Sequence, residues 1–180
     1  MKHSRKLILN RAFPGSVALL FTALSSVSAT ASADEPVFTM TTIIDSAHGA
    51  EIAAGKYQQA IEKIAVIDND VDAFFNNTNL CVAYTKTGSL DDALLACSAA
   101  VEQADGISFY RLGYLSRSFK ERRRSEYLAM ALSNRGVLRA AMGDVELARQ
   151  DFVEALSVRA RSSVAKTNLV RLDKVGAKKV

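Results

Sequence analysis

Three alternating aspartates, Asp68, Asp70 and Asp72, are the residues most suggestive of metal chemistry. Alternate carboxylates open a calcium-binding loop, but such a loop also needs a glycine at its sixth position and an acid at its twelfth. Those positions hold Ala73 and Asn79. We therefore interpret the three aspartates as a turn between helices and expect no metal site there.

The chain contains few residues of the types and spacing that catalysis needs. After residue 33, His48 is the only histidine, and one histidine without a cysteine or acid at ligand spacing predicts no zinc site. Glycine-rich phosphate loops and nucleophile elbows are absent from the sequence, and the serines have no paired base. We expect no catalytic residues, no metal and no cofactor, and predict that the protein is not an enzyme. An enzyme with an unrecognised site is the alternative from another functional class.

The two cysteines have a spacing that permits a disulfide. Cys81 lies seven residues before Gly88, and Cys97 lies nine residues after it. In an antiparallel helical hairpin that turns at Gly88 and Ser89, the two thiols would face each other. An oxidising compartment would join them. The alternative is a pair of small buried hydrophobic side chains.

A basic run forms the sharpest charge feature, with Lys120, Arg122, Arg123 and Arg124 around a single glutamate. One interpretation is a patch for an acidic partner, an anionic lipid or an envelope polymer, which includes peripheral contact with a membrane. The alternative is a solvated helix face that keeps the domain soluble.

The first 33 residues have the pattern of a secretory signal peptide. Four basic residues precede an apolar run at 17–24, and Ala31-Ser32-Ala33 matches a cleavage site. The run is shorter than the roughly 20 apolar residues of a spanning helix, so we expect no transmembrane span. The predicted location is periplasmic or secreted.

Charge is balanced overall but divided along the chain. Without the four basic residues of the signal, 19 basic and 19 acidic residues remain, so we predict no nucleic-acid binding. Residues 34–105 contain twelve acidic residues and three lysines, whereas residues 106–180 contain sixteen basic and seven acidic residues. This asymmetry favours salt-sensitive association, including self-association.

A short pattern repeats three times: Gly55, Gly88 and Gly143 are each followed by alanine five positions later. Each glycine ends one amphipathic stretch, and each alanine lies early in the next. The first interval is 33 residues and the second is 55, which fits a repeat near 34 residues with an insertion of about 21. We place the insertion at about 106–127, partly as an aromatic loop and partly as an extension of the next helix, with a capping box starting at Ser118.

These features predict an all-α protein of stacked helical hairpins. We expect a flexible lead at 34–40 and a repeat domain at 41–175. Its first helix contains Ile43 and Ile44, and its last runs from about 163 to 175. A basic tail at 176–180 follows.

The repeated residues resemble those of the tetratricopeptide repeat (TPR) family, in the form found in exported bacterial proteins. The fullest match is Asn134, Gly136, Gly143, Asp144, Ala148, Asp151, Phe152, Ala155 and Leu156. A second match is Asn79, Leu80, Ala83, Tyr84, Gly88, Ala93 and Ala100, and the weakest is Gly55, Tyr57 and Ala60.

The resemblance implies a right-handed α-superhelix with a groove that binds peptides. Asn79 and Asn134 occupy the place of an asparagine that often contacts the backbone of a bound peptide in this family. The groove face would also include Thr78, Val82, Lys86 and Val137. The implied function is an interaction module, or scaffold, for a protein or peptide partner in the cell envelope, with the basic C-terminal half as the alternative binding surface.

The resemblance also places Arg135 opposite Asp151 and predicts an ion pair between them. Two residues depart from the family pattern. Arg139 replaces a usual aromatic residue, and His48 replaces a usual small residue, so we expect local repacking at both positions.

Overall fold

Helices make up the regular secondary structure of the described part of the chain. The computed structural model describes residues 37–66, 72–104, 106–107 and 116–177, which form helices but no strand. This confirms the all-α prediction. In chain order the helices are α1 (Gly49–Ala53), α2 (Tyr57–Ile64), α3 (Ala73–Thr87), α4 (Leu90–Gln103), α5 (Arg117–Met142), α6 (Val145–Val158) and α7 (Ser163–Ala177). All belong to one compact unit, Asp34–Val180.

Several predicted features lie outside these residues: the signal peptide at 1–33, the start of the lead at 34–36, the turn at Asp68 and Asp70, and the end of the basic tail at 178–180. Within the described ranges, no helix combines the length and apolar character needed to cross a membrane.

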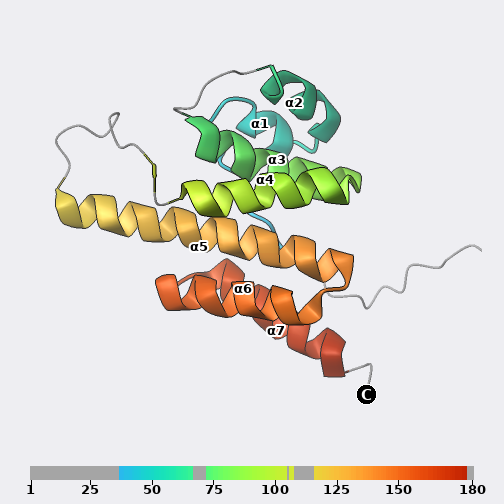
Figure 1. The fold of residues 1–180 in the computed structure, drawn as a ribbon, viewed down its shortest axis with the longest axis vertical. Helices are drawn as coiled ribbons and strands as arrows, with labels where there is room; N and C mark the ends of the chain where they lie inside the picture. Colours follow the sequence, from blue (N-terminus) through green and yellow to red (C-terminus); the bar gives the residue numbers. More distant parts are fainter. Residues whose placement is uncertain (1–36, 67–71, 105, 108–115, 178–180) are drawn as a thin grey trace, which may run out of the picture. The chain divides into compact units, whose positions relative to one another are not determined.

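Consecutive helices pair into antiparallel hairpins, α3 with α4 and α5 with α6 (Figure 1). The turns are made by Gly55, Gly88 and Gly143, whose φ angles are +77°, +82° and +90°. Glycine adopts this left-handed conformation without the strain that a side chain would add, so it ends each helix where the sequence pattern predicts.

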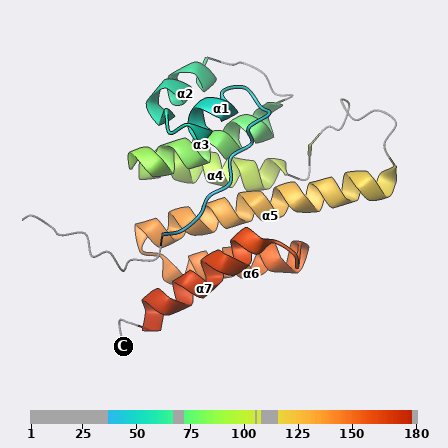
Figure 2. The ribbon, with the colours of Figure 1, turned by 180° about the vertical axis from the view of Figure 1, so that it is seen from behind.

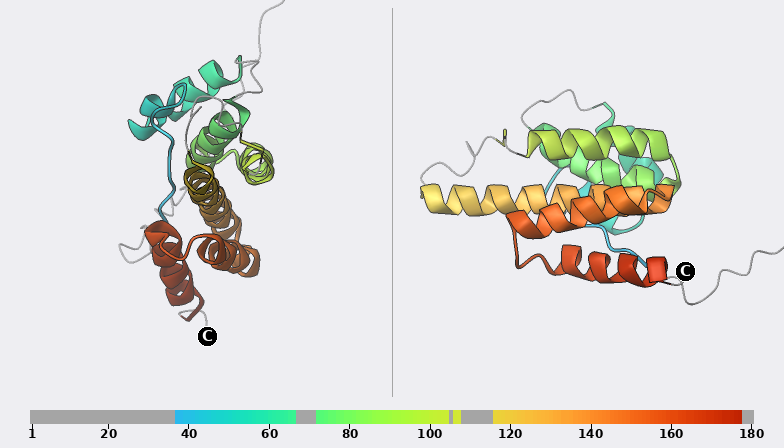
Figure 3. Two further views of the ribbon diagram at one scale, coloured as in Figure 1. Left: turned by 90° about the vertical axis from the view of Figure 1, so that its left-hand side faces the viewer. Right: turned by 60° about the horizontal axis from the view of Figure 1, so that its bottom comes forward.

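The hairpins are joined through α5. It packs against α3 and α4 on one side and against α6 and α7 on the other (Figure 3). The odd-numbered helices α3, α5 and α7 therefore form one continuous row, because α3 contacts α5 and α5 contacts α7.

Helix α5 is longer than its partners, with 26 residues. Its first turns supply part of the predicted insertion, while residues 108–115 of the aromatic loop lie outside the described ranges. The expected cap at Ser118 is wrong by two residues. Ser116 is the N-cap, and its hydroxyl accepts a hydrogen bond from the Phe119 N–H.

Two other helix ends differ from the prediction. The first helix excludes Ile43 and Ile44 and begins only at Gly49, because His48 before it adopts a left-handed φ of 58°. Position 48 therefore precedes the helix instead of packing within it. At the other end, α7 continues through Gly176 to Ala177.

The α5–α6 hairpin is held by an ion pair between the two residues that the repeat resemblance places opposite each other. The Arg135 guanidinium lies 2.7 Å from the Asp151 carboxylate, and Asp151 is only 1% exposed. Arg139, the departure from the family pattern, approaches the same carboxylate at 2.9 Å. One acid on α6 is thus shared by two arginines from successive turns of α5.

Candidate functional site

Residues 37–43, here called the strap, cross the row of helices as an extended segment. Figure 2 shows this segment in blue, passing over α5 between α7 and α1. The predicted flexible lead at 34–40 is therefore wrong for residues 37–40. The backbone of Thr39 is hydrogen-bonded to α7, and the side chains of Phe38 and Met40 pack against the core.

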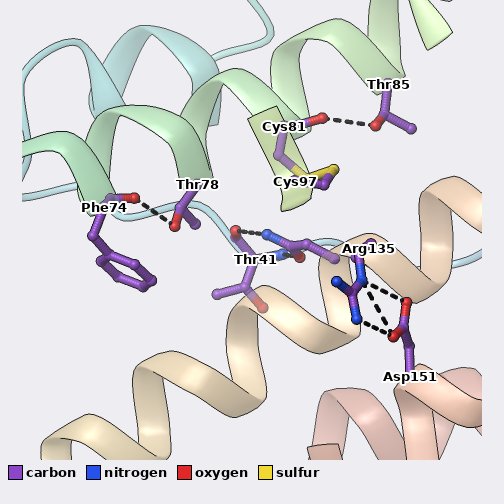
Figure 4. The surroundings of a disulfide bond; sticks show 9 residues. Thr41, Phe74, Thr78, Cys81, Thr85, Cys97, Arg135 and Asp151 are labelled. Carbon is purple, nitrogen blue, oxygen red and sulfur yellow. Dashed lines mark hydrogen bonds and ion pairs between the residues drawn. A yellow bond between two sulfur atoms is a disulfide. The ribbon is translucent and has the colours of Figure 1, made fainter. Parts of the chain in front are cut away.

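Three asparagines bind the strap backbone, one from each odd-numbered helix. Asn168 of α7 accepts from the Thr39 N–H at 2.9 Å and donates to its carbonyl at 2.7 Å. Asn134 of α5 makes the same two bonds to Thr41, both at 2.8 Å (dashed at Thr41 in Figure 4). Asn79 of α3 makes them to Ile43, at 2.9 and 3.1 Å.

We call Asn79, Asn134 and Asn168 the asparagine row. Each carboxamide takes the place of a peptide group on a neighbouring β-strand, since its oxygen accepts and its nitrogen donates. In an extended chain the N–H and C=O of one residue point to the same side, and the next residue points to the other. The row therefore pairs with every second strap residue, at steps of about 7 Å along the chain.

Burial makes these bonds obligatory. All three asparagine side chains of the row are 0% exposed. A buried amide without a partner destabilises a protein by about 1–3 kcal/mol. Two of the side-chain NH2 groups also make a second hydrogen bond. Asn79 Nδ2 donates to the Ser46 hydroxyl at 2.6 Å, and Asn168 Nδ2 donates to the Ser133 hydroxyl at 3.4 Å.

Side chains of the strap add apolar contacts at three positions. The Phe38 ring stacks on Phe152 of α6, with ring centroids 6.4 Å apart. Met40 packs against three separate core clusters, those containing Ile52, Cys81 and Phe152. Ile43 packs against the cluster around Phe74.

The other predicted groove residues divide into two groups. Val137 belongs to the cluster that receives Phe38 and Met40, and Val82 to a cluster that receives Met40. Thr78 is fully buried and its hydroxyl donates to the Phe74 carbonyl within α3, while Lys86 is exposed near the end of that helix.

Asn168 is the functional residue that sequence reasoning missed. It lies 34 residues after Asn134, which is one repeat length. The signal was therefore present, but α7 lacks the glycine–alanine pattern that identifies the other hairpins. The strap itself has no comparable signal, because its role depends on pairing with residues up to 129 positions away.

Cys81 of α3 and Cys97 of α4 form a disulfide, with their Cα atoms 4.7 Å apart (Figure 4). Both residues are buried, and Leu138 of α5 and Met40 of the strap pack against the same cluster. The bond therefore joins α4 to α3, the helix that also carries Asn79.

The basic run at the start of α5 is partly engaged within its own helix. The guanidinium carbons of Arg122 and Arg123 lie 5.2 and 5.5 Å from the centre of the Phe119 ring. Arg123 also pairs with Glu126 at 3.6 Å. Lys120 and Arg124 have no ion pair among the described residues, and they stand four positions apart on one helix face.

A second cluster of polar side chains links α1 to α2. Glu51 contacts His48 Nδ1 at 3.2 Å and Lys63 Nζ at 3.3 Å. The hydrogen bond from His48, with smaller help from Lys63, lowers the pKa of Glu51 from 4.5 to about 2. Among the described residues, histidine, cysteine and acidic side chains nowhere gather in a group of three that could hold a metal ion.

No protein-family model, curated protein or solved structure matches this chain significantly.

Proposed function

We propose that the protein is a non-catalytic scaffold that binds an extended segment of a protein partner through the asparagine row. The observation that carries this is the set of paired hydrogen bonds by which three buried asparagines bind backbone groups two residues apart. Recognition of an extended peptide by its backbone, with side chains filling alternate contacts, is an established binding mode.

The resemblance to the TPR family also supports this proposal. Asn79 and Asn134 are the residues that the resemblance places in a peptide-binding groove, and both contact a peptide backbone, here that of the chain itself. We infer that the hairpins form a TPR-type right-handed superhelix with α3, α5 and α7 as its inner helices. The disulfide supports an exported, oxidising location.

A titration with a capped peptide of residues 37–43 tests the proposal. At millimolar peptide we expect NMR shifts of the strap's own Thr39, Thr41 and Ile43 backbone amides, because the peptide takes over their bonds to the row. Asn134→Ala should abolish the shifts. Asn77→Ala is the matched control, because Asn77 bonds Gln103 and not the strap. Binding that leaves these strap amides unperturbed would contradict the proposal.

A second candidate function is contact with an anionic surface through α5. It is favoured by Lys120 and Arg124, like charges at i, i+4 whose repulsion a bound anion would relieve. Vesicles containing anionic lipid should sediment the protein at low salt, and changing both residues to Ser should abolish this. Lys166→Ser, an exposed change on α7, serves as the control.

A further inference from the structure

The strap behaves as a separate layer laid on a completed helical stack. Among the described residues, Thr39 and Thr41 are the members of 37–42 with backbone hydrogen bonds, and all four bonds go to asparagine side chains. Only at its last residue does the strap bond another backbone group, where the Ile43 carbonyl accepts from the Ser46 N–H at 3.3 Å. The helices beneath pack on one another directly, α3 on α5 and α5 on α7. Departure of the strap would leave these contacts in place and open the asparagine row to water.

We propose that the strap is an internal ligand, displaced when a partner segment of the same pattern binds. This deepens the proposed function and rests on it. Numbered from Phe38, the ligand has large apolar side chains at positions one, three and six. It has a free backbone N–H, and hence no proline, at positions two, four and six.

Each requirement corresponds to a contact that the strap makes. Position one needs a ring to stack on Phe152, and position three needs a flexible side chain such as Met40, which reaches three clusters. At position two, Arg171 donates to the Thr39 hydroxyl at 2.8 Å. A side chain with an acceptor oxygen is therefore favoured there.

The order of these contacts also fixes the chain direction. Position one lies against α6, and position six lies at Asn79 of α3. A peptide of reversed sequence would bring its aliphatic side chain to Phe152 and its ring to the cluster around Phe74. The ligand therefore runs from α7 towards α3, as the strap does.

Competition by the strap reduces the apparent affinity for any such partner. The apparent dissociation constant equals the intrinsic one divided by the fraction of molecules with the site open. If the strap is bound in 99 of 100 molecules, binding weakens about 100-fold. A change that loosens the strap without touching the helices must therefore strengthen peptide binding.

Thr41→Pro is such a change in the full chain. Proline removes the N–H that donates to Asn134 while it favours extended backbone in itself and in the residue before it. Thr42→Pro is the matched control, because the Thr42 N–H has no partner among the described residues. Fluorescence anisotropy with labelled peptide 37–43 should show binding about tenfold tighter to Thr41→Pro than to the wild type or Thr42→Pro. A reversed-sequence peptide should not bind.

Equal affinity for all three proteins would overturn the proposal, since the strap would not compete, yet it would leave peptide binding by the asparagine row intact. Hydrogen exchange gives an independent check in the wild type. The amides of Thr39, Thr41 and Ile43 should exchange faster than those of central α5. If they exchange only on global unfolding, the strap is a permanent part of the fold and displacement is refuted. Fast exchange without peptide binding to any variant would instead refute the proposed function.

Discussion

Asparagine is suited to the three positions of the row because its side chain carries both halves of a peptide group. Aspartate of the same size would accept from the strap N–H but repel the carbonyl oxygen beside it. Leucine would leave both backbone groups unpaired. The paired bonds at Thr41, in the middle of the strap, have equal lengths of 2.8 Å. They make Asn134 the most informative residue to change.

Asn134→Asp should therefore weaken the strap and destabilise the fold. The carboxylate would face the Thr41 carbonyl in a site that is 0% exposed, and we expect a loss of about 2–3 kcal/mol in the free energy of unfolding. Urea denaturation followed by circular dichroism measures it. Asn77→Asp, on the partly exposed side of α3, should change the value by less than about 1 kcal/mol. Equal losses in the two variants would contradict the role of Asn134.

Asp151→Asn should also lower the free energy of unfolding, but through the loss of an ion pair. It removes the one carboxylate that two arginines share, and we expect a loss of about 3 kcal/mol, as for other buried pairs that lose one partner. Exchanging the charges of Arg135 and Asp151 should recover little of this, because Arg139 would then face a cation on α6 in place of the carboxylate. Glu154→Gln, an exposed change on α6, is the control for thermal denaturation. Full recovery in the exchanged protein would show that Arg139 does not share the acid.

Glu51 makes the α1–α2 hairpin sensitive to acid. Its pKa is lowered to about 2 in the folded protein, chiefly by the His48 hydrogen bond. A group whose folded pKa is depressed stabilises the fold above its unfolded value, and the contribution disappears as pH falls through the folded pKa. The difference in Tm between the wild type and Glu51→Gln should thus shrink between about pH 5 and about pH 2. Glu102→Gln, exposed on α4, should give no such trend.

At the scale of elements, the disulfide fixes the hairpin that carries Asn79. A bridge across 16 residues stabilises a fold by about 3 kcal/mol, mainly by restricting the unfolded chain. Reducing agent should lower the urea midpoint of the wild type accordingly. A variant with both Cys81 and Cys97 changed to Ala should unfold at the same midpoint with and without reductant. If the urea midpoint of the wild type is the same with and without reductant, the bridge is absent in solution.

The helical hairpins can be predicted from the local sequence. The site cannot, because it depends on hydrogen bonds between residues far apart in the chain. Gly88 and Gly143 require positive φ, so turns at these positions are readable from composition and spacing alone. Helix α7 carries Asn168 at the repeat spacing but has no second helix of its own in the described residues, and the periodic pattern is incomplete there. The strap is a short polar–apolar alternation whose partners lie on three different helices. Nothing local distinguishes it from a loose terminal segment.

The strap changes how the whole stack holds together. In a repeat array each unit contacts only its neighbours, so the ends can unfold independently. Here the strap connects α7 to α3 through Asn168 and Asn79, two helices that are not adjacent in the row. Tertiary contacts that bridge distant repeats add cooperativity that nearest-neighbour packing does not provide.

Loosening the strap should therefore reduce cooperativity more than it reduces helix content. In Thr41→Pro we expect α7 amides to exchange faster, while amides of α3, held by the disulfide, change less. The urea transition should broaden, with a smaller m-value, because α7 then separates from the rest before global unfolding. Thr42→Pro should keep the wild-type m-value. A transition in Thr41→Pro that shifts without broadening would show that α7 is held by its packing on α5 and α6 alone.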